Sequence, residues 1–558
     1  MDEVFGTIER ITFQSEESGF TVAQLKTSKV KDPVCIVGTL PMAQPGETVR
    51  CQGHWKRHPS HGLQFEVTDY SLEQPADIQG IQKYLGSGLI KGIGPIYAKK
   101  IVEKFGIQTL QIIDTEPKRL KEVEGLGPKR VQLIATCWSE QRTIRDVMIF
   151  LQTHGVTPGF AQKIYKKYRE RSIQVVSENP YVLARELHGV GFKSADKIAA
   201  KLGIARDSLY RFEAGIEYTL RGLSEEGHVC FPKTKLMEET ATLLEIESSV
   251  LDAALDSLKK DERIEIFPIL HEGDFVPFVW LMPLFVAETG IARELKRVLA
   301  HPCSMRSIDT TRALPWVQER LSITLADNQK KAVAEALTSK LMIITGGPGT
   351  GKSTITKAIL AISSQLTSKI ALAAPTGRAA KRMSEITGYK ALTIHALLEV
   401  DFKRGGFKRG KQNPLDLDLL IVDEASMIDT HLMYSLLRAV PPHARVLFVG
   451  DIHQLPSVGP GNVLKDMIQS KKMTVITLTE IFRQAAGSRI ITNAHKINQG
   501  HFPDLEPHPE SDFFFIEAED PEELAQQIVA CVAERLPRKY GFHPFDDIQV
   551  LAPMKKAR

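Results

Sequence analysis

Residues 345–354 read Thr-Gly-Gly-Pro-Gly-Thr-Gly-Lys-Ser-Thr, and this stretch limits the possible folds more than any other part of the chain. The apolar run 341–344 before it is typical of a buried parallel strand, and residues 355–360 after it are typical of a helix. The pattern G-x-x-x-x-G-K-[ST] predicts a phosphate loop, in which backbone N–H groups at a helix start surround a phosphate chain. In such a loop Lys352 reaches the β- and γ-phosphates, and the Ser353 hydroxyl binds Mg²⁺. We therefore expect ATP and Mg²⁺ as cofactors, with ATP held by Gly346, Gly347, Pro348, Gly349, Thr350, Gly351, Lys352, Ser353 and Thr354.

Two more apolar runs end in polar residues that suit the same site. The run 419–422 is followed by Asp423 and Glu424, and the run 445–449 precedes a polar cluster that contains Gln454. Asp423 is expected to hold Mg²⁺, and Glu424 to activate the attacking water. We expect Gln454 to sense the γ-phosphate. The alternation of strands and helices from about residue 306 predicts an α/β domain with a doubly wound parallel sheet.

Other polar positions around this sheet also carry expectations. Gln329 lies on a helical stretch before the loop strand, where its amide could form two hydrogen bonds with an adenine edge. Arg483 follows the strand-like run near 478 and is expected to act as an arginine finger. The basic, aromatic-bearing stretch 401–411 predicts an inserted hairpin, which is either a plain surface loop or a pin that separates nucleic acid strands.

Residues 76–205 contain an internal repeat of glycine-rich turns between helices. Each turn has a glycine, an apolar residue and a second glycine, followed by a helix that starts with small and basic residues. Such a turn can present backbone N–H groups to a DNA phosphate, although it can also be a plain helix connector. From Ile81 to Tyr210 there are 22 Lys and Arg against 12 Asp and Glu, which favours DNA contact. The expected phosphate-facing glycines are Gly92 and Gly94, Gly125 and Gly127, and Gly189 and Gly191, with a weaker copy at 154–158.

The regions on either side of this repeat have different patterns. Residues 1–75 contain short alternating runs separated by turn signals, which predict an all-β barrel of OB type. Residues 206–305 contain three helical stretches, 211–225, 238–243 and 248–260, followed by two strands, 264–267 and 278–282. Helices followed by a hairpin predict a winged-helix-like module.

Composition says little about function but narrows the cellular compartment in which the protein is expected. The net charge of the 558 residues is only +4, and hydrophobic content of 43% is ordinary for a globular protein. Six scattered cysteines without a C-x-x-C pair argue against zinc and disulfide frameworks, so we expect a cytoplasmic protein. The sequence contains no run of 18 apolar residues, so it predicts no membrane span.

The order of these motifs resembles a known family. Gln329, GGPGTGKST, APTGRAA, TIH, IVDEASM, GDIHQLPSVGPG and LTEIFRQ together look like superfamily 1 helicases of the RecD/TraA branch. The N-terminal barrel and helix-hairpin-helix array are similar to the stand-alone RecD-like type. The resemblance implies RecA-like motor domains that use ATP to move 5′→3′ on single-stranded DNA and to unwind duplexes. It also implies single-stranded and forked DNA as partners, a monomer, and DNA-facing roles for Pro375, Thr376 and His395.

One departure from the family pattern concerns the second motor domain. The strand expected at 547–551 is followed by only seven residues, so later family motifs are absent and the second motor domain should be incomplete. The alternative to an active helicase is therefore a DNA-binding protein whose motor binds ATP but unwinds poorly or not at all. An RNA helicase is disfavoured by the helix-hairpin-helix array. We expect five parts: an OB-like barrel (1–75), the helix-hairpin-helix array (76–205), the winged-helix-like module (206–305), a first motor domain (306–475, with an insert at about 400–413) and the start of a second (476–558).

Overall fold

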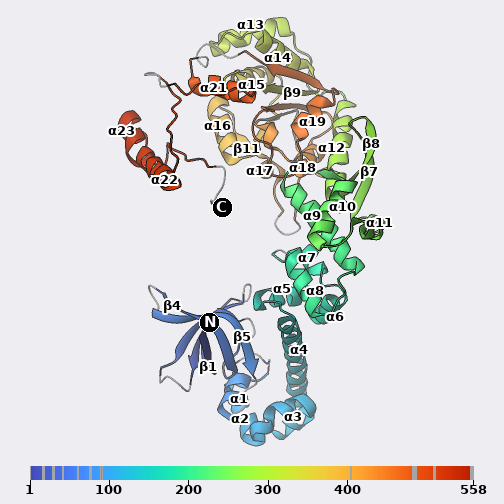
Figure 1. Cartoon of the computed structure of the whole chain (residues 1–558), viewed down its shortest axis with the longest axis vertical. Helices are drawn as coiled ribbons and strands as arrows, with labels where there is room; N and C mark the ends of the chain where they lie inside the picture. The colour runs from blue at the N-terminus through green and yellow to red at the C-terminus, as the bar shows by residue number, and fades with distance from the viewer. Residues whose placement is uncertain are drawn as a thin grey trace. The chain divides into compact units, whose positions relative to one another are not determined.

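A computed structural model describes residues 2–15, 19–27, 32–40, 43–58, 62–73, 78–87, 90, 92–187, 189–401, 405–480, 487–506 and 511–552 (Figure 1). The chain forms two compact units. The first consists of Met1–Leu223 and Cys230–Met282, and the second of Ser224–Val229 and Pro283–Arg558.

The first unit begins with a closed five-stranded barrel, as predicted for residues 1–75. Its strands are β1 (Asp2–Gln14), β2 (Phe20–Lys26), β3 (Val34–Thr39), β4 (Thr48–His58) and β5 (Gly62–Glu73), paired in the order β1-β2-β3-β5-β4. Two register shifts in β1 bend this strand, which lets it pair with β2 along one half and with β4 along the other. Ile8, Leu25, Ile36 and Phe65 are fully buried in the barrel core.

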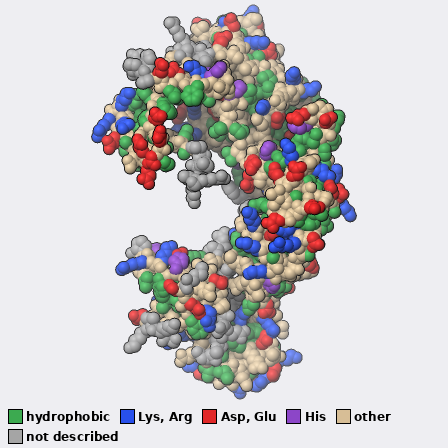
Figure 2. Space-filling model, viewed as in Figure 1, with side chains coloured by type: hydrophobic (Ala, Val, Ile, Leu, Met, Phe, Trp, Pro, Cys, Tyr) green, Lys and Arg blue, Asp and Glu red, His purple; other side chains and the backbone are tan. Residues whose placement is uncertain are grey.

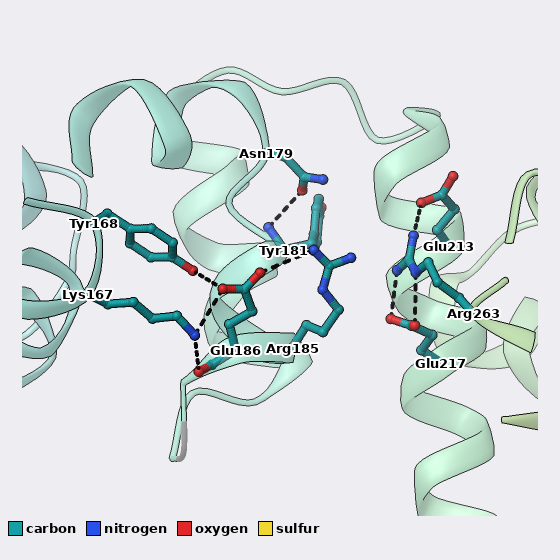
Figure 3. Close-up of polar contacts among 9 residues, drawn as sticks. All are labelled: Lys167, Tyr168, Asn179, Tyr181, Arg185, Glu186, Glu213, Glu217 and Arg263. Carbon is teal, nitrogen blue, oxygen red and sulfur yellow. Dashed lines mark hydrogen bonds and ion pairs between the residues drawn. The ribbon is translucent and has the colours of Figure 1, made fainter. Parts of the chain in front are cut away.

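The predicted helical array follows the barrel. Its helices are α1 (Ile78–Gly86), α2 (Pro95–Phe105), α3 (Thr109–Thr115), α4 (Pro128–Thr153), α5 (Pro158–Tyr168), α6 (Ser172–Glu178), α7 (Val182–Glu186) and α8 (Phe192–Lys201). Glu186 at the end of α7 accepts hydrogen bonds from Tyr168 and Arg185, at 3.0 and 3.3 Å, and pairs with Lys167 at 2.9 Å (Figure 3). These contacts fix α7 against α5.

A module of three helices and three short strands comes next. It comprises α9 (Leu209–Glu225), β6 (Cys230–Pro232), α10 (Lys233–Leu244), α11 (Asp252–Lys260), β7 (Ile264–His271) and β8 (Asp274–Leu281). The helices and the β7–β8 hairpin match the prediction, whereas β6, which completes a sheet of order β6-β8-β7, was missed because it has only three residues. Arg263 ties the hairpin to α9 through two carboxylates, Glu213 and Glu217 (Figure 3). The winged-helix identity stays a prediction.

The second unit is built around a six-stranded sheet whose strands are all parallel. The order is β11 (Ala391–Thr393), β10 (Ile370–Ala374), β12 (Leu419–Val422), β13 (Arg445–Gly450), β9 (Leu341–Gly346) and β14 (Thr474–Leu478). The predicted doubly wound sheet is therefore confirmed. β14 crosses the boundary expected at 475/476, because residues 474–478 pair with β9 and complete the first sheet.

Helices cover both faces of this sheet. Buried residues of α12 (Met282–Leu299), α18 (Thr430–Ala439) and α19 (Val463–Gln469) share one apolar cluster with the strands. Those of α13 (Thr310–Leu321), α14 (Asp327–Thr338), α15 (Lys352–Ser363) and α16 (Gly377–Thr387) share a second cluster. The short helix α17 (Ile394–Leu398) follows β11. Since apolar side chains alternate between the faces, the strands β9, β10, β12 and β13 contribute buried residues to both clusters.

The last part of the chain differs from the prediction. It contains α21 (Arg489–Asn498), α22 (Pro521–Ala530) and α23 (Leu536–Tyr540), with a π-helical turn (Cys531–Arg535) between the last two. The strand expected at 547–551 was wrong. A strand needs a neighbour for its backbone hydrogen bonds, and in the described part of the chain this segment pairs with none, leaving Leu551 84% exposed. Within the residues that the structure describes, no helix is long and apolar enough to cross a membrane.

Candidate nucleotide-binding site

A pocket of about 920 Å³ lies at the carboxyl edge of the parallel sheet in the second unit. The phosphate loop follows β9, Asp423 and Glu424 follow β12, and Gln454 follows β13, so the three segments meet at one edge. The structure thus brings together most of the residues that the sequence assigned to ATP and Mg²⁺. The lining includes Gln329, the loop residues 347–354, Asp423, Glu424 and Gln454.

The loop has the backbone geometry expected of a phosphate cradle. Gly349 and Gly351 have positive φ values of 75° and 83°, which residues with a side chain rarely adopt. Gly351 is also the N-cap residue of α15. Gly346 does not line the pocket. It lies behind the loop, where an added Cβ would come within 2.9 Å of Leu478 Cβ. Close packing against Leu478 therefore explains why this position is glycine.

Lys352 points its ammonium group into this loop. The Nζ atom donates to the carbonyl oxygen of Gly347 at 3.0 Å and also to that of Gly346. Burial lowers the pKa of Lys352, and the nearby carboxylates of Asp451, Glu424 and Asp423 oppose that shift. The pocket therefore holds a cation beside the two acids Asp423 and Glu424, which suits a bound phosphate chain with a divalent ion.

The two acids after β12 are partly buried, and the backbone of the second is strained. Burial raises the pKa of both Asp423 and Glu424, and the charge of Asp423 raises that of Glu424 further. Glu424 has a φ of 51°, which is unusual for a residue with a side chain. Among the described residues, its Oε2 atom is buried without a hydrogen-bond partner. Such an oxygen fits a role in binding a water molecule. With the hydroxyl of Ser353 and the carboxylate of Asp423 in the same pocket, the oxygen donors fit Mg²⁺.

Gln329 is buried, with 3% of its surface exposed, and is oriented by two hydrogen bonds. Its Nε2 donates to Thr350 O at 3.1 Å, and its Oε1 accepts from Ala326 N at 3.2 Å. An amide has two N–H groups and two acceptor lone pairs, so one of each remains. The remaining pair fits the donor and acceptor of an adenine edge.

The turns of the helical array share one backbone geometry. Gly92, Gly125, Gly155 and Gly189 have φ values of 101°, 90°, 83° and 94°. The second turn position is extended and caps the following helix, and it is glycine in three turns and Thr157 in the weaker copy. A Cβ added at Gly94, Gly127 or Gly191 would meet nothing within 4 Å. These three positions are therefore open to close approach by a ligand.

The four turns form two similar pairs. In the first pair, Gly125 faces the ring of Tyr97, and in the second, Gly189 faces the ring of Phe160. Both aromatic residues occupy the third position of the helix after the first turn of the pair. Lys and Arg side chains lie over α5, α7 and α8 on the face that Figure 2 shows. The structure thus confirms the repeat, including its weaker copy, as two tandem pairs.

Comparisons with known proteins decide the family. Family models match residues 329–460 (AAA domain), 140–230 (ATP-dependent RecD2 DNA helicase HHH domain), 1–75 (ATP-dependent DNA helicase YrrC, OB-fold domain) and 88–139 (SAM-like helix-hairpin-helix tandem). The ATP-dependent RecD2 DNA helicase of Deinococcus radiodurans is 31% identical over 512 residues, covering 90% of this chain and 70% of that protein. The chain belongs to the RecD2 helicase family.

More distant matches cover smaller parts of this RecD2 family member. The RecBCD enzyme subunit RecD of Haemophilus influenzae is 41% identical over 167 residues, which is 26% of each chain. The ATP-dependent DNA helicase dda of Enterobacteria phage T4 is 35% identical over 177 residues, 29% of this chain and 40% of that one. The crystal structure of Pif1 helicase from Candida albicans is 22% identical over 39% of this chain and 55% of its own, with a TM-score of 0.28, too low to support an argument.

The expected DNA-facing residues of the RecD2 motor lie outside the nucleotide pocket. Thr376 caps α16 by accepting a hydrogen bond from Ala379 N at 3.2 Å, and Pro375 directly precedes it. The ring of His395 on α17 lies 5.7 Å from that of Phe407. Phe407 belongs to the basic insert, of which 405–411 are described and show only isolated pairing, Val400 with Phe407 and Gly410 with Asn413. The DNA roles stay predictions. Arg483 lies outside the described residues.

Several residues in or beside the pocket were missed by the sequence reasoning. Asp451 directly follows β13, is 2% exposed and acts through its charge on Lys352 from outside the pocket lining, and the signal for it was the Gly-Asp pair at the end of that strand. Arg382 lines the pocket from α16, and its positive charge acts to lower the pKa values of Asp423 and Glu424. Ile323 and Ile491 also line the pocket. Nothing in the sequence pattern connected α21 with the phosphate loop.

Proposed function

We propose that this chain is an ATP-dependent DNA helicase that moves 5′→3′ along single-stranded DNA and separates duplex strands. The observation that carries the proposal is the pocket where the phosphate loop, the pair Asp423–Glu424 and Gln454 converge at one sheet edge. Membership of the RecD2 family supports the reaction class. The 5′→3′ direction rests on the resemblance to RecD-like helicases.

Each of the pocket residues would have a separate role in the hydrolysis of ATP. Backbone N–H groups of the loop and the Lys352 ammonium would hold the β- and γ-phosphates. Ser353 and Asp423 would hold Mg²⁺, which when bound neutralises phosphate charge. Glu424 would take a proton from the attacking water. Its raised pKa makes it a stronger base than an ordinary carboxylate.

Helix α16 offers a physical link between ATP and DNA. Its N-terminus carries Thr376, a proposed DNA contact, and Arg382 on the same helix lines the ATP pocket. A rigid helix that contacts both ligands would transmit a small shift at the phosphates to the DNA. Pro375 and His395, at the ends of the neighbouring strands, would complete the contact with single-stranded DNA.

The helix-hairpin-helix pairs would hold the DNA backbone without reading sequence. Open space at Gly94, Gly127 and Gly191 lets a phosphate reach the backbone N–H groups at each helix start. The second candidate function is a DNA-binding protein whose motor binds ATP without unwinding. This second candidate is favoured only if the chain binds DNA but does not separate its strands.

A strand-separation assay on partial-duplex DNA tests the proposal. Substrates with a single 5′ tail, a single 3′ tail or an RNA 5′ tail are compared, with Lys352→Ala as the inactive control. We expect ATP-dependent separation of the DNA with the 5′ tail and none with Lys352→Ala. Separation from the 3′ tail would refute the direction. Tight DNA binding without any separation would support the second candidate, and a preference for the RNA tail would refute the DNA assignment.

A further inference from the structure

Helix α21 lies against the phosphate loop, although 147 residues separate the two contacting positions in sequence. The Nε2 atom of His495 is 3.4 Å from the carbonyl oxygen of Pro348. A Cβ added at Gly347 would lie 2.7 Å from His495 Cε1, so the imidazole packs directly over that glycine. Ile491, one helical turn earlier, lines the ATP pocket. One face of α21 is therefore a wall of this pocket.

This wall is held in place by polar contacts to the segment that follows α21. Asn493, which is 1% exposed, donates through Nδ2 to Asp504 O at 2.9 Å and accepts from Asp504 N at 2.8 Å. Ser488 caps the helix, and Asp512 accepts hydrogen bonds from its hydroxyl group and from Arg489 N, the latter at 2.8 Å. Because buried or paired groups on both sides fix α21, His495 has a defined position.

The chemistry of the contact identifies what His495 presents to the phosphate loop. Two acceptors repel each other, so the ring nitrogen facing the Pro348 carbonyl must carry its proton. This N–H is therefore used by the Pro348 carbonyl, and the contact holds the rim of the phosphate loop. We propose that His495 is a positioning residue for ATP binding, which fixes the shape of the phosphate loop by donating to Pro348 and packing over Gly347, with α21 as the outer wall of the site. This inference rests on the proposed function, because it requires that the loop binds ATP.

Direct binding measurements on the full chain test the proposal without relying on turnover. Isothermal titration with ATP and Mg²⁺, and separately with AMP, is carried out on the wild type, His495→Ala and His495→Gln. We expect His495→Ala to weaken ATP binding about fivefold, as for one lost hydrogen bond to a neutral carbonyl. His495→Gln should restore most of the affinity, because its amide N–H can take the place of the ring N–H. AMP binding should be unchanged. His501→Ala is the matched control, since His501 is an exposed histidine of the same segment.

A double-substitution cycle tests the packing on Gly347. Gly347 is not among the glycines with positive φ, so Gly347→Ala fits its backbone but conflicts with the His495 ring. We expect Gly347→Ala to weaken ATP binding. The double variant Gly347→Ala/His495→Ala should bind no worse than His495→Ala alone, because the conflict is gone. Additive losses would overturn the contact.

The outcomes separate this inference from the proposed function. If Lys352→Ala abolishes ATP binding while His495→Ala binds as the wild type does, the inference fails and the ATP site stands. Equal weakening of ATP and AMP by His495→Ala would show a structural role and also overturn the inference. If Lys352→Ala binds ATP normally, both the site and the inference fail.

Discussion

The buried amide of Gln329 leads to a prediction about nucleotide choice. One N–H and one lone pair are used by Thr350 O and Ala326 N, and the remaining pair matches N7 and the N6 amino group of adenine. A bidentate amide–adenine pair discriminates against other bases by about 1–3 kcal/mol. Guanine presents an acceptor where adenine presents a donor. The wild type should therefore prefer ATP over GTP by roughly 30-fold, for about 2 kcal/mol.

Replacing Gln329 separates base recognition from support of the loop. Gln329→Ala removes the adenine pair, the hydrogen bond to Thr350 O that tethers the loop to α14, and the hydrogen bond from Ala326 N at the start of α14. Loss of the tether should weaken ATP and GTP equally, whereas loss of the adenine pair should lower only the ATP/GTP affinity ratio, to near one. Competition titrations with both nucleotides give the two numbers independently. A ratio that stays at the wild-type value in Gln329→Ala would refute the adenine role.

Three other predictions concern the acid pair, the DNA turns and the barrel. Glu424→Gln should bind ATP as the wild type does but lose at least about a hundredfold in hydrolysis rate, measured by phosphate release, because the base is gone; a rate within a few-fold of the wild type would contradict its role. Gly127→Ala should weaken DNA binding several-fold in anisotropy titrations without changing thermal unfolding, since its Cβ meets only open space, whereas Gly125→Ala should lower the unfolding temperature because of its φ of 90° and the Tyr97 ring; equal effects on stability would argue against the open turn. Burial raises the pKa of Glu47 to about 7, against the attraction of Arg145. The contribution of Glu47 to folding stability is therefore present below pH 4.5 and is lost as the pH rises through about 7. Glu47→Gln should reduce the loss of hydrogen-exchange protection in β4 between pH 5 and pH 8, and an unchanged pH dependence would exclude Glu47 as the source of that loss.

The sequence predicted the parts of the ATP site that depend on local patterns. A phosphate loop, an acidic pair after a buried strand and a glutamine before the loop are each defined by neighbours in sequence. Parallel strands then place them at one edge of the sheet. The helix-hairpin-helix turns were likewise recognisable, because a positive φ at the first position and close approach at the second both select glycine. The weaker copy keeps the first glycine but has Thr157 at the second position.

What the sequence could not predict depends on contacts between distant segments. Ile491 lines the pocket and His495 contacts the loop only because α21 packs against the loop in the fold, and their spacing alone is that of any amphipathic helix. Nothing in the sequence distinguishes Arg382 from the other cations on helices. The strand expected at 547–551 failed for the opposite reason, since an apolar run specifies a strand only when a neighbouring strand is there to pair with it.

Hydrolysis of ATP in the presence and absence of single-stranded DNA is the most direct test of the account. The wild-type chain and Lys352→Ala are compared at saturating ATP and Mg²⁺, with a single-stranded RNA of the same length as a second control. The account predicts slow hydrolysis without nucleic acid, strong stimulation by DNA, weak stimulation by RNA, and no hydrolysis by Lys352→Ala. Equal hydrolysis by the wild type and Lys352→Ala, or a wild-type rate that DNA leaves unchanged, would contradict an ATP-driven motor on DNA.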